Sequence, residues 1–269
     1  MRTEAMESAL EDIEFLALSA NRVEVLDAVS SQPHTRRELE ERTGASQPTL
    51  GRILHDFEDR NWVEQSGREY AATPTGRLVG AGFSDLREIV ETEQRLRRVA
   101  NWLPTETMTF DLRRLRDATI TTPTQTRPNA PVQRVLELLR DAERVEIVSH
   151  AFNEQSMDVV RRRVDDGQQT FEGVFSASAI DAIADDSTLR ERLRELLDLP
   201  GADLRIVDDE VPVAVTVADD VVHLFLRDDD GLLQASVDTD DETVVSWAHD
   251  VHERYWNAAR ALDAADLDD

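Results

Sequence analysis

The chain has 269 residues, with 56 acidic residues against 30 basic ones, no cysteine and a formal net charge of −26. At this length it can bury two separate cores, and without cysteine it can form neither a disulfide framework nor a thiolate zinc site. The sequence has no apolar run of membrane-spanning length, and its first twenty residues lack a basic leader region. We therefore expect a cytoplasmic protein with no membrane partner.

The acidity argues against a nucleic-acid partner, because the neutralisation of phosphates dominates affinity for DNA. The choice of residues weakens that argument. Every basic residue is arginine, and aspartates crowd into runs such as 228–230. This composition resembles that of proteins from extreme halophiles, where roughly molar salt shortens the Debye length to about 3 Å and long-range repulsion from DNA fades. The charge then reflects a halophilic habitat.

The segment 21–75 has the order of a winged helix-turn-helix: helix, short helix, turn, third helix and hairpin. Thr35 and Glu38 predict a capping box, Gly44 ends the short helix, and Ser46 caps the third helix. Apolar residues of the third helix recur at i, i+3, i+4 and i+7, which indicates that one of its faces belongs to a core. The order of these elements points to DNA.

The hairpin is predicted from β-prone runs at 62–65 and 70–72 around Ser66-Gly67-Arg68. This wing and the polar face of the third helix carry side chains that can reach phosphates and base edges in a major groove. The predicted DNA-binding residues are Arg36, Ser46, Gln47, Thr49, Gly51, Arg52, His55 and Arg68. Two alternatives stay open, because the three helices can also be a simple packing unit or can bind a protein partner.

Residues 83–103 predict a long amphipathic helix with apolar positions at near-heptad spacing. Pairing with a second copy of the chain and packing on its own domain are both consistent with this stripe, because Glu93 and Gln94 interrupt it. The expected regions are a DNA-binding domain at 1–80, a helical linker or dimerisation segment at 81–117, and an α/β effector-binding or regulatory domain at 118–269.

Past Pro131 helices and strands alternate, which predicts a sheet with a parallel start and an antiparallel meander at its end. The expected strands are 144–149, 170–175, 203–207, 211–217, 221–226 and 232–237, and the expected helices are 132–139, 153–164, 178–197 and 241–262. The overall fold class is therefore α+β: a winged helix-turn-helix, a helical linker and an α/β sensor-like domain.

A small anionic or polar effector is predicted to bind the α/β domain. The acid-free segment from 118 to 134 carries Thr122, Thr124 and Arg127. His150 and Asn153 follow a predicted strand, at the position where α/β sheets hold ligands against a helix N-terminus. We expect these five residues to line one pocket. The alternatives are that the segment is a plain linker and that the histidine is structural.

No catalytic residue, cofactor or metal site is predicted, because the sequence has no Gly-rich phosphate loop and no nucleophile elbow. His249 and His252 share a helix surface at i, i+3, but a third metal ligand is missing from their surroundings in the sequence. The order of the last domain resembles phospholipase-D-type sensor domains of some archaeal regulators. An active hydrolase of that type needs a His-x-Lys pair, which cannot exist in a chain without lysine.

Three parts of the sequence resemble the archaeal winged-helix regulators related to the methanogenesis regulatory protein, in a haloarchaeal form. They are the run from Arg37 to Arg52, Trp62 before the wing, and the run Ala118-Thr-Ile-Thr-Thr-Pro123. The resemblance implies a homodimeric transcription regulator that binds double-stranded DNA, with a C-terminal domain that senses a small molecule or mediates association. The alternatives are a winged-helix protein-interaction module and a degenerate hydrolase-like sensor without a DNA role.

Overall fold

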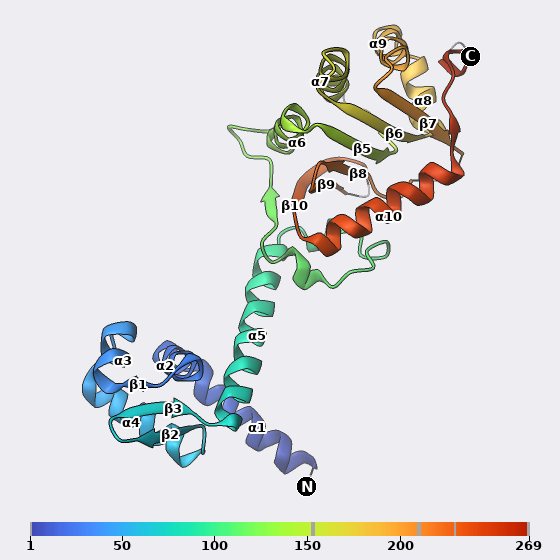
Figure 1. The fold of residues 1–269 in the computed structure, drawn as a ribbon. Coiled ribbons are helices and arrows are strands. Elements are labelled where there is room, and N and C mark those ends of the chain that lie inside the picture. Colours follow the sequence, from blue (N-terminus) through green and yellow to red (C-terminus); the bar gives the residue numbers. More distant parts are fainter. Residues whose placement is uncertain (1, 152–153, 209–210, 229, 268–269) are drawn as a thin grey trace. The chain divides into compact units, whose positions relative to one another are not determined.

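The structure, a computed structural model, describes residues 2–151, 154–208, 211–228 and 230–267 (Figure 1). It divides into two compact units, residues 1–91 and residues 92–269, which we call the N-terminal and the C-terminal unit. Among the described residues, none of the helices combines the length and the apolarity needed to cross a bilayer. The expected α+β fold class is confirmed.

The N-terminal unit has the predicted winged-helix order. Its elements are α1 (Arg2–Ala17), α2 (Ala20–Ser31), β1 (His34–Thr35), α3 (Arg36–Thr43), α4 (Gln47–Asp59), β2 (Val63–Ser66), β3 (Glu69–Ala72) and the first part of α5 (Pro74–Leu96). The three strands form an antiparallel sheet in the order β1-β3-β2, and the β2-β3 hairpin is the wing. The third helix of the sequence analysis is thus α4.

Local signals in the sequence set the ends of α3 and α4. The Thr35–Glu38 capping box is present, and Gly44 ends α3 with a φ of 67°, in the left-handed region that favours glycine. The Ser46 side chain accepts a hydrogen bond from the Thr49 backbone N–H and so caps α4. The apolar face of α4 is buried, and the Phe57 ring lies 5.9 Å from that of Trp62.

The start of α5 depends on close packing against Trp62. Thr73 caps the helix, since its hydroxyl accepts a hydrogen bond from the Gly76 backbone N–H. A Cβ atom at Gly76 would overlap the carbonyl oxygen of Trp62, so only glycine fits there. The amphipathic helix expected at 83–103 is therefore found nine residues earlier, and it ends at Leu96 because the chain turns inward to bury Val99.

The C-terminal unit contains one eight-stranded sheet in the order β11-β7-β6-β5-β8-β9-β10-β4. Its elements are η1 (Ala100–Trp102), η2 (Leu112–Leu115), β4 (Thr119–Thr121), α6 (Ala130–Asp141), β5 (Arg144–Ser149), α7 (Glu154–Asp165), β6 (Thr170–Ser176), α8 (Ala177–Ala184), α9 (Ser187–Leu197), β7 (Ala202–Val207), β8 (Val215–Ala218), β9 (Val221–Arg227), β10 (Leu233–Thr239), α10 (Glu242–Ala258), β11 (Arg260–Ala261) and η3 (Ala264–Leu267). Figure 1 shows α6, α7 and α9 on one face of the sheet and α10 on the other.

The pairing of the strands follows the prediction. β5, β6 and β7 are parallel, whereas β8, β9 and β10 form an antiparallel meander. One core lies between the sheet and the helices α6 to α9. A second core lies on the α10 side, and the segment from Leu96 to Leu115 contributes apolar side chains to it.

Three expected elements have different limits in the structure. Residues 119–121, expected in a linker or loop, form the edge strand β4, which pairs with β10. The strand expected at 211–217 is shorter, because Pro212 cannot donate a backbone hydrogen bond and pairing starts only at Val215. The last helix ends at Ala258, and Arg260 and Ala261 pair with β7 instead.

Candidate DNA interface and ligand sites

Helix α4 presents a polar face beside its buried one. Ser46, Gln47, Arg52 and His55 are exposed on this face, and Thr49 and Gly51 are half-buried. Arg68 is exposed in the turn of the β2-β3 wing, and Arg36 is exposed at the start of α3. The fold of the N-terminal unit therefore brings all eight predicted DNA-binding residues to the surface of the helix-turn-helix and its wing.

Several of these side chains also hold the local structure together. The Nε of Arg36 donates to the Tyr70 hydroxyl at 3.1 Å, and the Gln47 amide donates to the Glu40 carboxylate at 2.6 Å. Ser46 caps α4, as described above. These three side chains help to hold α4 in place relative to α3 and the wing. They therefore stabilise the polar face of α4 in addition to forming part of the predicted DNA-binding surface.

Arg52 and Arg68 differ from them, because neither side chain makes an ion pair or hydrogen bond within the described residues. In contrast, the neighbouring Arg37 binds Glu41 at 3.0 Å. In a chain with almost twice as many acids as bases, two exposed and unpaired guanidinium groups are available to an anion from outside. Glu64 and Glu69, which are exposed on the wing, oppose that attraction.

The acid-free segment forms an ordered turn. The backbone N–H groups of Thr124 and Arg127 each donate to the other's carbonyl oxygen at 3.1 Å. Thr122, Thr124 and Arg127 line a hollow of about 490 Å³ next to the first turn of α6, which starts at Ala130. This hollow is open to solvent, and Arg134 and Glu137 also line it.

His150 lies elsewhere, after the last residue of β5. It lines a separate hollow of about 510 Å³ at the carboxyl ends of the parallel strands, together with Ser176, Ser178 and Asp208. Asn153 lies outside the described residues. The pocket expected from the sequence is thus divided, since His150 and the segment 122–127 line different hollows.

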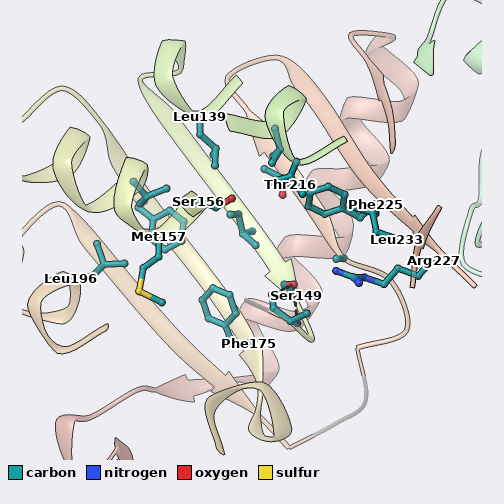
Figure 2. Close-up of a pocket in the computed structure, with 17 residues that line it drawn as sticks. Leu139, Ser149, Ser156, Met157, Phe175, Leu196, Thr216, Phe225, Arg227 and Leu233 are labelled. Atoms are coloured by element: carbon teal, nitrogen blue, oxygen red, sulfur yellow. Dashed lines mark hydrogen bonds between the residues drawn. The ribbon is translucent and has the colours of Figure 1, made fainter. Parts of the chain in front are cut away.

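A third cavity, more enclosed, lies between the sheet and the helices α6 and α7 (Figure 2). Its volume is about 100 Å³, and apolar side chains such as Met157, Phe175 and Phe225 form most of its wall. Ser149, Thr216 and Arg227 supply polar atoms. Gly173 contributes to its shape, because a Cβ atom there would lie 2.6 Å from the Phe175 ring and 2.9 Å from the Phe171 ring.

The charged group of this cavity is Arg227. Its Nη1 donates to the Gly231 carbonyl oxygen at 2.8 Å, whereas its Nε is buried and has no hydrogen-bond partner in the described part of the chain. A buried donor without a partner costs about 1–3 kcal/mol, so an anionic group of a ligand would stabilise this arrangement. The sequence analysis missed this site, although Arg227 ends a strand that is otherwise mostly apolar.

Two protein-family models match the chain. The model of the HVO_A0261 N-terminal domain matches residues 10–95, and the model of the methanogenesis regulatory protein FilR1, middle domain, matches residues 128–258. The comparison with curated proteins gave no match.

The solved structures that match the chain have low sequence identity to it. TrmBL2, described as an archaeal chromatin protein, is 17% identical over 92% of this chain and 98% of that chain, with a TM-score of 0.42. Nuc of Salmonella typhimurium, a phospholipase D family member, is 15% identical over 54% of this chain and 98% of that chain, with a TM-score of 0.43. An IclR transcriptional regulator from Alicyclobacillus acidocaldarius is 13% identical over 94% and 96%, with a TM-score of 0.24.

The two family matches lie in the order expected for a regulator, with the N-terminal domain first and the FilR1-type domain second. Together they account for most of the two units described above. The chain belongs to the archaeal transcription regulators related to the methanogenesis regulatory protein FilR1.

Proposed function

We propose that this regulator binds double-stranded DNA through α4 and the wing. The observation that supports this most is the pair of exposed guanidinium groups of Arg52 and Arg68, which have no partner among the described residues. Arg52 would enter the major groove with α4, where arginine recognises guanine, and Arg68 would bind a phosphate from the wing. High salt would weaken the repulsion between the acidic chain and DNA.

A mobility-shift assay in high potassium chloride, with DNA fragments selected from a genomic library, tests the proposal. The Arg52→Ala, Arg68→Ala double variant should lose the shift. The matched control is Arg37→Ala, Arg162→Ala, which removes the same charge from exposed arginines that pair with neighbouring acids. No shift of the wild type, or full affinity in the first double variant, would favour a protein-interaction role for the winged helix.

We further propose that the regulator is a homodimer, with α1 and α5 at the interface. Apolar side chains on both helices remain exposed, in a unit whose own core is complete: Met6, Leu10 and Ile13 on α1, and Leu86, Ile89 and Val90 on α5. Two copies would also place two α4 helices on adjacent half-sites. Light scattering at micromolar concentration in molar potassium chloride should give twice the chain mass, and Ile89→Glu should give a monomer. A monomeric wild type would contradict the proposed homodimer.

The C-terminal unit is proposed to bind an effector in the enclosed cavity, with an acidic group of the ligand at Arg227. A cavity of about 150 Å³ holds benzene, so about 100 Å³ admits a small apolar carboxylate and excludes nucleotides. In thermal-shift screening with short branched aliphatic acids, Arg227→Met should lose the stabilisation and Arg127→Ala should keep it. If Arg127→Ala lost the stabilisation and Arg227→Met kept it, the result would favour the predicted anion site at Thr122, Thr124 and Arg127.

A further inference from the structure

A second group of ionisable side chains lies on the opposite face of the sheet, under α10. Glu146 of β5 and Glu172 of β6 are direct partners in the parallel register, so their side chains leave the sheet on the same face. The helix α10 packs on that face and brings His249 and His252, which are one turn apart, toward the two carboxylates. Residues 146, 172 and 249–252, far apart in the sequence, thus meet at one point.

The distances within this group suit a shared cation. Glu146, Glu172 and His252 each offer one ligand atom, and the three atoms lie within 4.8 Å of one another. The His252 Nδ1 is 3.7 Å from the Glu146 Oε2, which is too far for a hydrogen bond. Two ligands of one tetrahedral zinc ion, each about 2.1 Å from the metal, are about 3.4 Å apart. The observed spacing of 3.7 Å is therefore closer to the spacing of two metal ligands than to a hydrogen-bond distance.

The hydrogen bonding of the group is incomplete. His252 is 95% buried, and its Nε2 has no hydrogen-bond partner among the residues that the structure describes. Glu146 is buried to a similar extent, and its carboxylate is held by the Arg144 guanidinium on one oxygen and by the His249 Nδ1 at 2.7 Å on the other. The Nδ1 of His252 is therefore the ring nitrogen that would bind the ion, while the Nε2 stays without a protein partner among the described residues.

We propose that Glu146, Glu172 and His252 bind one divalent transition-metal ion, with His249 and Arg144 holding the Glu146 carboxylate in place. One imidazole and two carboxylates suit zinc and its first-row neighbours, whereas calcium requires six to eight oxygen ligands. Three protein ligands leave a fourth position for water. The ion would fasten α10 to β5 and β6, so its first effect would be on the stability of the C-terminal unit.

Isothermal titration of the full chain with zinc chloride, after treatment with a chelator, tests the proposal. The wild type should bind one ion per chain, and cobalt chloride should give the visible absorption of a four-coordinate site. His252→Gln and Glu172→Gln should abolish both signals. His249→Gln should weaken binding by about 10–100-fold, as expected for a side chain that orients a ligand.

The matched control is Glu253→Gln, which removes an exposed carboxylate from α10 next to His252 and should bind zinc like the wild type. Circular dichroism of the metal-free variants shows whether they fold. Glu172 is only half-buried, so the Glu172→Gln variant remains informative if His252→Gln does not fold. Absence of zinc binding by the wild type, or unchanged binding by folded Glu172→Gln, would overturn the proposal.

Discussion

Two pairs of arginines, one pair in each unit, have opposite roles. In the N-terminal unit, Arg52 and Arg68 are exposed and make no ion pair within the described residues. In the C-terminal unit, Arg134 donates to both oxygens of Asp238, whose side chain is 3% exposed, and Arg144 pairs with the buried Glu146. The first pair of guanidinium groups is available to an external anion, whereas the second pair compensates acids inside the fold. Net charge alone hides this difference.

The comparison is tested most strongly at Asp238. Asp238→Ala would leave Arg134 without its main counter-ion, and the resulting loss should be about 3 kcal/mol of the free energy of unfolding, since Arg134 is partly buried. In the N-terminal unit, Arg37→Ala breaks a fully exposed pair and should cost less than about 1 kcal/mol. Urea denaturation of both variants in molar salt measures the two values. Equal losses would contradict the distinction between the units.

Arg52 and Arg68 should differ from one another in DNA binding. Arg52→Ala should cost about 1–3 kcal/mol on the preferred sequence and little on unrelated DNA, because contacts to base edges carry specificity. Arg68→Ala should weaken binding to all sequences alike and lower the slope of log affinity against log salt by about 0.9. Titrations with preferred and scrambled DNA at several salt concentrations separate the two. Similar selectivity changes in both variants would place the wing in base recognition as well.

Two glycines of α5 test how closely this helix packs within the N-terminal unit. Gly76→Ala should destabilise the fold by about 1–3 kcal/mol, because the new methyl group overlaps the Trp62 carbonyl oxygen. Gly82→Ala should stabilise it by about 0.4–1 kcal/mol, since a Cβ atom meets nothing there and alanine favours the helix. Thermal unfolding of the two variants gives the sign of each change. A stable Gly76→Ala variant would show that α5 can move away from Trp62.

A further expected effect concerns pH. Burial keeps the pKa of His223 below its ordinary 6.5, while Asp238 beside it at 3.8 Å opposes the shift and Arg134 adds to it. Below pH 6.5, His223 therefore binds a proton in the unfolded chain but not in the folded chain. This difference lowers the free energy of unfolding with decreasing pH by at most about 1.4 kcal/mol per pH unit. The Asp238 pKa, which burial raises but His223 and Arg134 lower overall, adds a further loss only near pH 4 and below.

Urea denaturation of the wild type and of His223→Gln between pH 7.5 and 5 checks the prediction, since glutamine does not titrate in that range. The variant should show a shallower decline of stability than the wild type. An identical pH profile would assign the decline to other groups.

The sequence was sufficient for the parts of the fold that depend on neighbouring residues. The capping box at Thr35, the end of the short helix at Gly44 and the apolar spacing in α4 are local signals, and all three were confirmed. The alternation of helices and strands likewise predicted the parallel and antiparallel parts of the sheet. Such patterns are read within a few turns of helix or a few residues of strand, without knowledge of the rest of the chain.

What could not be predicted depends on contacts between distant segments. The three residues of β4 are too few for a strand pattern and become one only by pairing with β10, more than a hundred positions later. The histidines of α10 were noticed at i, i+3, but Glu146 and Glu172 meet them only through the folded sheet. The division of the expected effector pocket has the same cause, because His150 and Arg127 lie near in sequence and line different hollows.

The core under α10 begins upstream of the FilR1-type family match at 128–258. Leu96, Val99, Leu103 and Leu115 pack there with Trp247 of α10. A gene fusion that carried only the matched residues to a new partner would leave this apolar surface uncovered and prone to aggregation. The segment that can be transferred to another protein as a folded domain therefore starts within α5. An exchange of DNA-binding domains between such regulators must have its junction before Leu96.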